Sequence, residues 1–235
     1  MRDNGEAASK PFLSAFSDPQ AVASYADGPR RFVPGLDALH TMTGLLLAER
    51  MPPDPRLLVL GAGGGLELTA LAAAYPDWRF VGVDPSALML DEARRVLGPH
   101  GDRVELVHGF IGDAPAGPFD GAVCLLTLHF LDAEARRETA ADIRRRLKAG
   151  APFVAAHGSF PQGPIERTRW LARYAAFAVA SGVAVEQAER FRAAVESNVP
   201  MLSPEEDEAI LRAAGFADVS LFYAAFTWRG WIAHA

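Results

Sequence analysis

The stretch LLVLGAGGGLEL, from Leu57 to Leu68, decides the fold of this chain. An apolar run passes directly into a glycine-rich loop and then into a helix-like pattern, which is how cofactor sites in α/β sheets usually begin. Glycines at such a turn let the backbone approach a ligand closely, because they carry no Cβ. The stretch therefore predicts a strand, a ligand-binding turn and a helix.

Short apolar runs alternate with longer helical patterns from Arg56 onward. This alternation indicates parallel strands joined by helical crossovers. We expect an α/β, Rossmann-like doubly wound fold with a mostly parallel seven-stranded sheet, N-terminal helices and a helical insertion before the last two strands. The expected parts are an N-terminal helical cover (1–55), a cofactor-binding core (56–160), a helical insertion serving as acceptor lid or dimer surface (161–200), and a C-terminal helix with closing strands (201–235).

Composition excludes several classes of protein. The chain has 235 residues, is 50% hydrophobic and carries a formal charge of −6, which argues against a broad nucleic-acid-binding surface. Cys124 is the only cysteine, so intramolecular disulfides are excluded and a reducing compartment is favoured. Neither a signal peptide nor an apolar run of roughly 20 residues is evident. We expect a cytoplasmic protein without membrane contact, and the Ala-rich insertion is compatible with a homodimer.

The glycine spacing narrows the choice of cofactor. Gly61, Gly63 and Gly65 form G-x-G-x-G, whereas a dinucleotide fingerprint requires glycine where Leu66 stands. The absence of a Walker lysine after the loop disfavours nucleoside triphosphates as well. Asp84 ends the next apolar strand, about 20 residues past the loop, where a carboxylate can accept hydrogen bonds from ribose hydroxyls.

Four segments, GAGGG, GVDPSALMLDEARRVL, RRRLKAGAPFVAA and PEEDEAILRAAGF, resemble a class I S-adenosylmethionine-dependent methyltransferase. Two more, RFVPGLDALHTMTGLLLAER and CLLTLHFLDAEARR, are similar to the group that makes carboxy-S-adenosylmethionine for tRNA wobble-uridine modification. The resemblance implies S-adenosyl-L-methionine as cofactor and S-adenosyl-L-homocysteine as product. We expect a small-molecule acceptor and no direct nucleic-acid contact.

The resemblance also implies which residues hold the cofactor. The loop holds the methionine part, the strand-ending acid holds the ribose, and residues after the third and fourth strands flank the adenine and the methionine. Arg31 is either a partner of the cofactor carboxylate or a solvated surface arginine. The full implied set is Arg31, Gly61, Ala62, Gly63, Gly65, Asp84, Pro85, Met89, Phe110, Ile111 and Leu125.

Several positions depart from the family pattern. Val59 replaces a common acid, and Phe110 and Leu125 replace polar residues, so apolar packing and backbone carbonyls carry more of the expected recognition. The carboxy-S-adenosylmethionine group uses an arginine where Ala193 stands here. The adjacent Arg192 is turned by about 100° on a helix, which disfavours that activity.

Three histidines, His108, His129 and His157, are expected at the carboxyl ends of the third, fourth and fifth strands. His157 and His129 are the predicted catalytic residues, acting as base or acceptor-orienting group, with a structural role as the alternative for each. Their spacing predicts no metal site, because no two share a helical i, i+3 or i+4 relation.

Aromatic residues supply a further set of candidates for the acceptor pocket: Tyr25, Trp170, Tyr174 and Phe177. Each could wall an apolar acceptor pocket, but a stripe of this kind is more often core packing or a dimer surface.

Three functional hypotheses follow from these observations. The leading one is a methyltransferase acting on a small molecule. The second is carboxy-S-adenosylmethionine synthesis with prephenate as carboxyl donor. The third is a non-catalytic binding protein, which predicts a filled or absent cavity at Gly61–Gly65.

Overall fold

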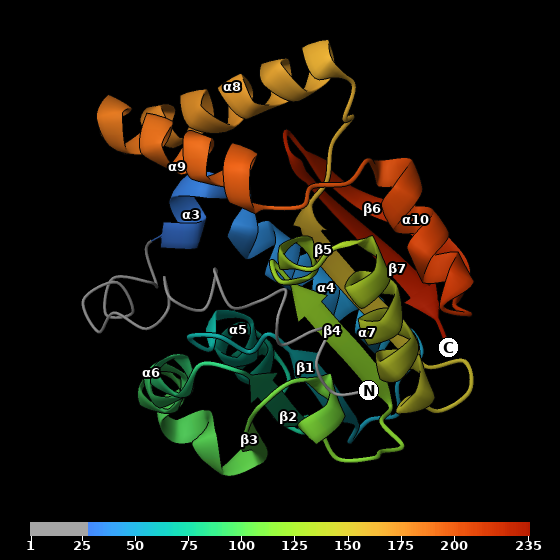
Figure 1. Ribbon diagram of the computed structural model, residues 1–235. Helices are drawn as coiled ribbons and strands as arrows, with labels where there is room; N and C mark the ends of the chain where they lie inside the picture. Colours follow the sequence, from blue (N-terminus) through green and yellow to red (C-terminus); the bar gives the residue numbers. More distant parts are fainter. Residues whose placement is uncertain (1–27) are drawn as a thin grey trace.

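The computed structural model describes residues 28–235, which form a seven-stranded sheet between layers of helices (Figure 1). The strand order is β3-β2-β1-β4-β5-β7-β6, and β7 runs antiparallel to both of its neighbours while the other pairs are parallel. This architecture confirms the expected fold class. The strands are β1 Arg56–Leu60, β2 Arg79–Asp84, β3 Val104–His108, β4 Gly121–Leu125, β5 Pro152–Gly158, β6 Ala217–Ala225 and β7 Trp228–His234.

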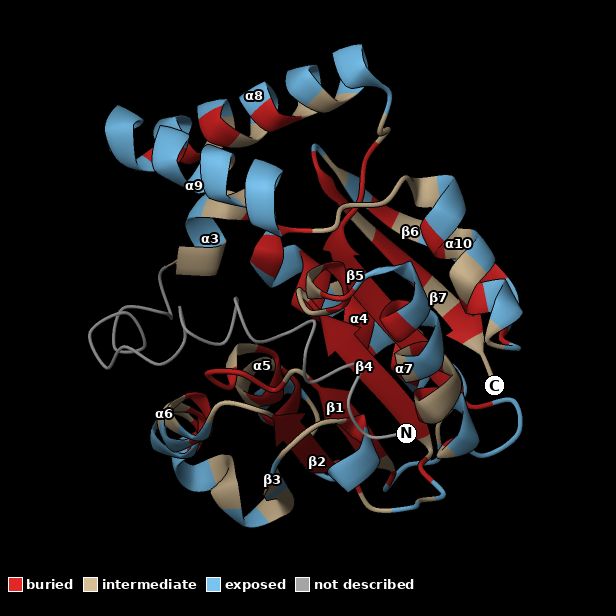
Figure 2. Cartoon of the chain, viewed as in Figure 1, coloured by how far each residue is buried: buried red, intermediate tan, exposed pale blue. Residues whose placement is uncertain are grey.

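The central strands are continuous apolar runs because both faces of the sheet are covered. All residues of β4 and β5 are buried, as Figure 2 shows by colour. Strands of a parallel sheet covered on both faces need apolar side chains on both sides, which explains the runs GAVCL and PFVAA.

Helices cover the two faces in separate sets. Leu39 of α4 and Leu68 of α5 belong to the apolar cluster on one face, whereas Ile143 of α7 and Leu211 of α10 belong to the cluster on the other. The α-helices are α3 Gly28–Phe32, α4 Leu36–Ala48, α5 Leu66–Ala74, α6 Ala87–Leu97, α7 Ala133–Arg145, α8 Pro164–Ala180, α9 Val185–Asn198 and α10 Pro204–Ala213. Short 3₁₀ turns are η2 Gly98–Arg103, η3 Ile111–Asp113 and η4 Leu128–Phe130.

The N-terminal helices α3 and α4 meet at a break around Val33-Pro34-Gly35. Gly35 has φ 71°, a left-handed conformation that glycine adopts without strain. The break is anchored to the last hairpin, because Trp228 Nε1 donates to the Phe32 carbonyl at 2.9 Å and Tyr223 donates to the Pro34 carbonyl. Tyr25 lies outside the described residues.

The insertion between β5 and α10 forms a hairpin of α8 and α9 that projects above the sheet (Figure 1). Its aromatic side chains pack within the chain. Tyr174 stacks on Phe32 of α3 at 5.3 Å between ring centroids, and Phe177 meets Phe226 at 5.9 Å. Trp170 lies under the guanidinium of Arg173. These contacts favour the packing interpretation of the three aromatics.

A capping box defines the start of helix α10. Ser203 accepts a hydrogen bond from the Glu206 N–H, and the Glu206 carboxylate accepts one from the Ser203 N–H. This reciprocal capping box, with Pro204 in the first turn, fixes the start of the helix. Within residues 28–235, no helix has the length and apolar character needed to cross a membrane.

Candidate active site

The glycine loop is pinned to the neighbouring strand β2. The N–H groups of Gly61 and Ala62 both donate to the Val83 carbonyl, at 2.9 and 3.1 Å. Gly61 has φ 75°, and a Cβ there would lie 1.9 Å from Thr127 Oγ1. Only glycine fits at this position, because the turn after β1 passes directly under the loop that follows β4.

Asp84, at the carboxyl end of β2, holds the same loop from the side. Its Oδ2 accepts a hydrogen bond from the Gly63 N–H and its Oδ1 accepts one from the Ser86 N–H, both at 2.9 Å. Burial raises the pKa of Asp84, and the two backbone hydrogen bonds and His108 oppose that effect. Each carboxylate oxygen keeps a further lone pair for a ligand.

A pocket opens at the switch point of the sheet, between β1 and β4. The strand order reverses there, because β2 and β3 lie on one side of β1 and β4 lies on the other. The volume of the pocket is about 1170 Å³, and part of this volume is open to solvent. It contradicts the expectation of a filled or absent cavity that accompanied the non-catalytic hypothesis. The lining comprises Leu36, His40, Leu60, Gly61, Gly63, Leu66, Glu67, Asp84, Pro85, Ser86, Met89, Gly109, Phe110, Ile111, Leu125, Leu126, Thr127, Phe130, Leu131 and Thr139.

One end of the pocket is apolar and lies beside β2 and β3. Met89 and Ile111 are buried there, and Phe110 is half-buried. The Phe110 N–H donates to the Asp113 carboxylate at 2.9 Å, which fixes the turn after β3. An aromatic ring and two aliphatic side chains form a wall suited to a flat heterocycle.

The loop after β4 forms the opposite wall. Leu125 is buried, and Leu126 has φ 55°, a left-handed conformation that is strained for a leucine. The Leu126 N–H donates to the Ala156 carbonyl at 2.6 Å, which holds the turn in place. Such strain is commonly found at ligand sites, because the surrounding structure must impose it.

Glu67 places a second carboxyl group in the pocket wall. It lies in the first turn of α5, is 7% exposed, and its Oε1 has no hydrogen-bond partner. Burial, opposed by a hydrogen bond from its own backbone N–H and aided by the negative charge of Asp84, raises the pKa of Glu67 to about 8. This residue is missing from the set implied by the sequence.

His40 is the histidine that lines the pocket among the residues described. It lies on α4, is 6% exposed, and burial lowers its pKa to about 4. Its imidazole is therefore uncharged at neutral pH and can accept a proton or a hydrogen bond.

Three members of the implied cofactor-binding set do not line the pocket. Ala62 is a fully buried residue of the loop itself. Gly65 serves helix packing, because a Cβ there would lie 3.0 Å from Ala93 Cα of α6. Arg31 is exposed on α3 and is absent from the lining. The other eight members do line it.

His157 and His129 occupy a different part of the molecule. His157 is 1% exposed on β5, and its Nε2 lies 3.2 Å from Asp207 Oδ1. Nδ1 of His129 accepts from the Gly158 N–H at 3.4 Å, and burial lowers its pKa. Neither side chain lines the pocket, so the geometry gives no support to their predicted catalytic role.

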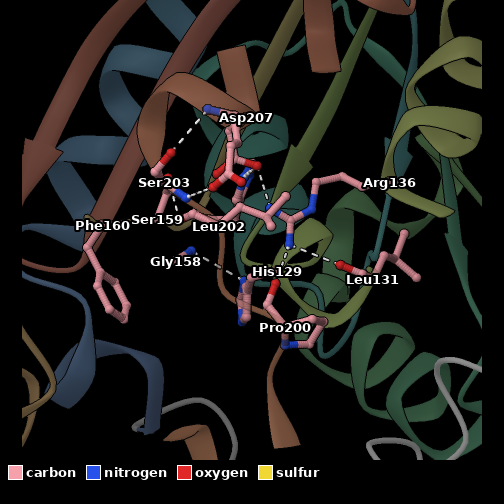
Figure 3. A network of polar contacts seen from close by, with 12 residues as sticks. His129, Leu131, Arg136, Gly158, Ser159, Phe160, Pro200, Leu202, Ser203 and Asp207 are labelled. Atoms are coloured by element: carbon pink, nitrogen blue, oxygen red, sulfur yellow. Dashed lines mark hydrogen bonds and ion pairs between the residues drawn. The ribbon is translucent and has the colours of Figure 1, made fainter. Parts of the chain in front are cut away.

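Both histidines lie at a buried polar network centred on Arg136, in which His157 meets Asp207 and of which Figure 3 labels His129, Arg136 and Asp207. Arg136 and Asp207 form an ion pair in which both side chains are 1% exposed. Arg136 Nη2 also donates to the carbonyls of Leu131 and Pro200, at 3.0 and 3.1 Å. The network therefore joins α7, α10 and the segment that returns from the α8–α9 hairpin.

The departures noted in the sequence have clear structural consequences. Val59 packs in the apolar cluster with Leu57 and Leu68 and does not line the pocket. Arg192 is engaged by Glu189 and Glu196, both at 2.7 Å, on the surface of α9. Among the residues described, no lysine or arginine lines the pocket, and no cluster of histidine, cysteine or acidic side chains is arranged to hold a metal ion.

A glycine loop fixed by a strand-ending aspartate, at the switch point of a 3-2-1-4-5-7-6 sheet, defines the class I methyltransferase architecture. Residues 58–153 match the family model described as a methyltransferase domain. Residues 58–153 therefore form a class I methyltransferase domain, a type of domain that uses S-adenosylmethionine as its cofactor.

Among characterised proteins, the chain is similar to carboxy-S-adenosyl-L-methionine synthase of Chromohalobacter salexigens. The two are 29% identical over 210 residues, which cover 88% of this chain and 78% of that protein.

Solved structures share the fold at lower identity. PigF with S-adenosylhomocysteine (SAH) aligns with a TM-score of 0.67 at 20% identity, covering 95% of this chain and 62% of that one. Human N-acetylserotonin methyltransferase in complex with S-adenosylmethionine (SAM) aligns with a TM-score of 0.62 at 13% identity, covering 95% and 58%. The chain thus spans about three fifths of the length of these two proteins.

Proposed function

We propose that this chain transfers a methyl group from S-adenosylmethionine to a small-molecule acceptor. The observation that carries the proposal is the pocket at the switch point, which combines the Gly61 and Gly63 loop, Asp84 and an uncharged imidazole. The glycine loop and Asp84 fit the binding of the cofactor. The uncharged imidazole fits an acceptor that loses a proton during methyl transfer.

The described lining fits the charge of the cofactor. It holds two carboxyl groups, Asp84 and Glu67, and no lysine or arginine. S-adenosylmethionine carries a sulfonium and an ammonium against one carboxylate, so an acidic pocket favours it. When bound, it supplies an electrophilic methyl group. Asp84 would accept hydrogen bonds from the ribose, and Phe110 and Ile111 would pack against the adenine.

His40 is the proposed acceptor-orienting group or base. Its imidazole is neutral, lies in the same pocket and comes from α4, which covers the sheet next to β5. A general base of this kind helps when the acceptor is a hydroxyl or a protonated amine. Leu36 and Phe130 line the pocket as well, which favours an acceptor with apolar surface.

Carboxy-S-adenosylmethionine synthesis is the second candidate, favoured by the similarity to synthases over most of the chain. That product carries an additional carboxylate, which needs a cation in the pocket. The described lining offers none, and Arg192 is paired with two glutamates. These observations favour methyl transfer. Mass spectrometry of the cofactor that co-purifies with the chain would separate the two, because only the synthase would retain the carboxylated form.

An acceptor screen tests the proposed function directly. The protein is incubated with S-adenosylmethionine and a panel of small phenols, catechols, amines and thiols, and S-adenosylhomocysteine formation is followed by liquid chromatography. We expect at least one acceptor to raise the rate above the acceptor-free background, with a matching methylated product. Formation of the carboxylated cofactor from prephenate, without any methylated product, would contradict the proposal.

A further inference from the structure

The acid that commonly precedes the glycine loop is absent from this chain, and the pocket contains a different acid in its place. Val59 is fully buried in an apolar cluster. Glu67, in the first turn of α5, lines the pocket instead. The chain therefore has valine at position 59, before the loop, and a carboxyl group at Glu67, after it.

One oxygen of the Glu67 carboxyl group lacks a hydrogen-bond partner within the described residues. The residue is 93% buried by accessible surface, and its Oε1 makes no hydrogen bond. An unpaired buried carboxyl group is costly, and buried acidic side chains are usually paired or bind a ligand. A group of this kind in a pocket wall indicates a cationic or hydrogen-bond-donating ligand.

The position of Glu67 indicates which part of the cofactor it would contact. Glu67 lies two residues past Gly65, the last glycine of the loop that is expected to hold the methionine part, and it lines the same pocket as Leu125 at the end of β4. The ribose is expected at Asp84, and the methionine part lies toward β4. Glu67 therefore belongs to the methionine side of the pocket.

We propose that Glu67 binds the ammonium group of the cofactor and so replaces the acid missing at Val59. This inference rests on the proposed use of S-adenosylmethionine, and it assigns Glu67 a binding role that depends on the methionine part of the ligand. The contact would be a charge-assisted hydrogen bond in a poorly solvated wall, which is stronger than its counterpart at the surface.

Binding at Glu67 is coupled to a proton. With a pKa of about 8, the free carboxyl group is mostly protonated at pH 6.5 and must lose its proton to pair with an ammonium. The titratable groups that interact with its charge are Asp84 and Cys124, and His40 lines the same pocket. Cys124 stays protonated because burial raises its pKa, and His40 stays neutral because burial lowers its pKa to about 4. Glu67 is thus the expected source of a proton released on binding.

Calorimetric titration with three ligands tests the assignment. The ligands are S-adenosylmethionine, S-adenosylhomocysteine and 5′-methylthioadenosine, which lacks the amino-acid part. In Glu67→Gln, we expect both amino-acid-containing ligands to bind about tenfold more weakly, equivalent to about 1.4 kcal/mol, while 5′-methylthioadenosine binds as before. Comparing binding enthalpies at pH 6.5 in buffers of different ionisation enthalpy should show proton release with the unaltered chain and none with the variant.

Two further variants exclude a merely structural effect. Glu134→Gln alters an exposed glutamate in the first turn of α7 and should leave all three affinities and the proton release unchanged. Glu67→Asp keeps the charge on a shorter side chain and should retain the proton release with reduced affinity. Circular dichroism at pH 6.5 confirms that each variant is folded.

Three results would overturn the inference. The first is unchanged S-adenosylhomocysteine affinity in Glu67→Gln, and the second is an equal loss for 5′-methylthioadenosine, which would indicate a role in pocket structure. The third is a loss confined to S-adenosylmethionine, which would place Glu67 at the sulfonium. If the unaltered chain binds none of the three ligands, the proposed function fails before Glu67 is tested.

Discussion

The carboxylate of Asp84 accepts a hydrogen bond from the Gly63 N–H at 2.9 Å, and this bond joins the end of β2 to the glycine loop after β1. The two elements are 21 residues apart in the chain. Their contact fixes the loop and the acid as one site, so a change at Asp84 should affect both ligand contact and loop position.

Asp84→Asn should weaken binding of S-adenosylhomocysteine and 5′-methylthioadenosine together, by about tenfold or more. The carboxylate accepts from two backbone N–H groups, whereas an amide has a single acceptor oxygen and leaves one of them unpaired. Calorimetric titration measures the loss. Asp91→Asn, on the exposed face of α6, is the control, and equal affinities in the two variants would contradict the role of Asp84.

Gly61→Ala should abolish cofactor binding and destabilise the fold by more than Gly150→Ala. Both glycines have positive φ, 75° and 73°, so each variant bears the backbone cost of about 1–2 kcal/mol. Only Gly61 also faces Thr127, whereas a Cβ at Gly150 meets nothing within 4 Å. Urea unfolding and calorimetric titration test the pair. Equal loss of stability would show that the contact with Thr127 does not matter.

His40→Ala should lower kcat by about a hundredfold while the dissociation constant of S-adenosylhomocysteine stays unchanged. The imidazole lines the pocket, and its pKa of about 4 keeps it in the proton-accepting form through neutral pH. Steady-state kinetics with an acceptor found by screening measures the effect. His157→Asn is the comparison variant and should lower stability without this loss of kcat, because His157 does not line the pocket.

Glu67 should make the stability of the ligand-free protein fall as pH rises. Its pKa is about 8 in the folded chain against 4.5 as the ordinary value, so the folded state binds the proton more tightly. The contribution is fully present below pH 4.5 and is lost as pH rises through 8. The thermal unfolding temperature of Glu67→Gln should therefore rise relative to that of the unaltered chain as the pH increases across this window. A constant difference between the two would count against a buried, unpaired carboxyl group.

Asp207→Ala should lower the free energy of unfolding by about 3–5 kcal/mol, because it leaves Arg136 buried without its ionic partner. Burial alone would raise the pKa of Asp207, but His157 and Arg136 hold it at about 2. This stabilisation is present above pH 3.8 and is lost as pH falls through 2. Asp91→Ala removes an exposed ion pair and should cost about 1 kcal/mol or less in urea unfolding. Similar losses of unfolding free energy in Asp207→Ala and Asp91→Ala would contradict a stabilising role of the Arg136 network.

The sequence predicted the fold well because the physical causes are local. Continuous apolar runs such as GAVCL report strands covered on both faces, and Ser203 with Glu206 marks a helix start through contacts three residues apart. The insertion was less fully predicted. Its division into α8 and α9 depends on the turn at Gly182, which has φ 89° inside an otherwise helical pattern.

The site was predicted in part, for a similar reason. Gly61, Gly63 and Asp84 lie within one strand-turn-helix pattern and the strand beside it, and the structure brings them together. Glu67 and His40 were missed, although each is a polar residue within an apolar helical stretch, LELTALAAA and LDALHTMTGLLLA. Such an interruption is a usable signal, but periodicity does not say whether the side chain faces a pocket.

The position of His157 depends on contacts between distant elements. Its place near the end of β5 suggested the ligand-binding edge, but its side chain meets Asp207, which comes from α10 some 50 residues later. Pairing between distant elements cannot be read from spacing, because it depends on how α7 and α10 pack against the sheet.

Calorimetric titration of the unaltered chain with S-adenosylmethionine and S-adenosylhomocysteine tests the central claim most directly. The account predicts one site for each ligand, with dissociation constants on the order of 1 µM to 1 mM, the range common for enzyme substrates, and with proton release at pH 6.5. No heat of binding for either ligand at millimolar concentration would contradict it.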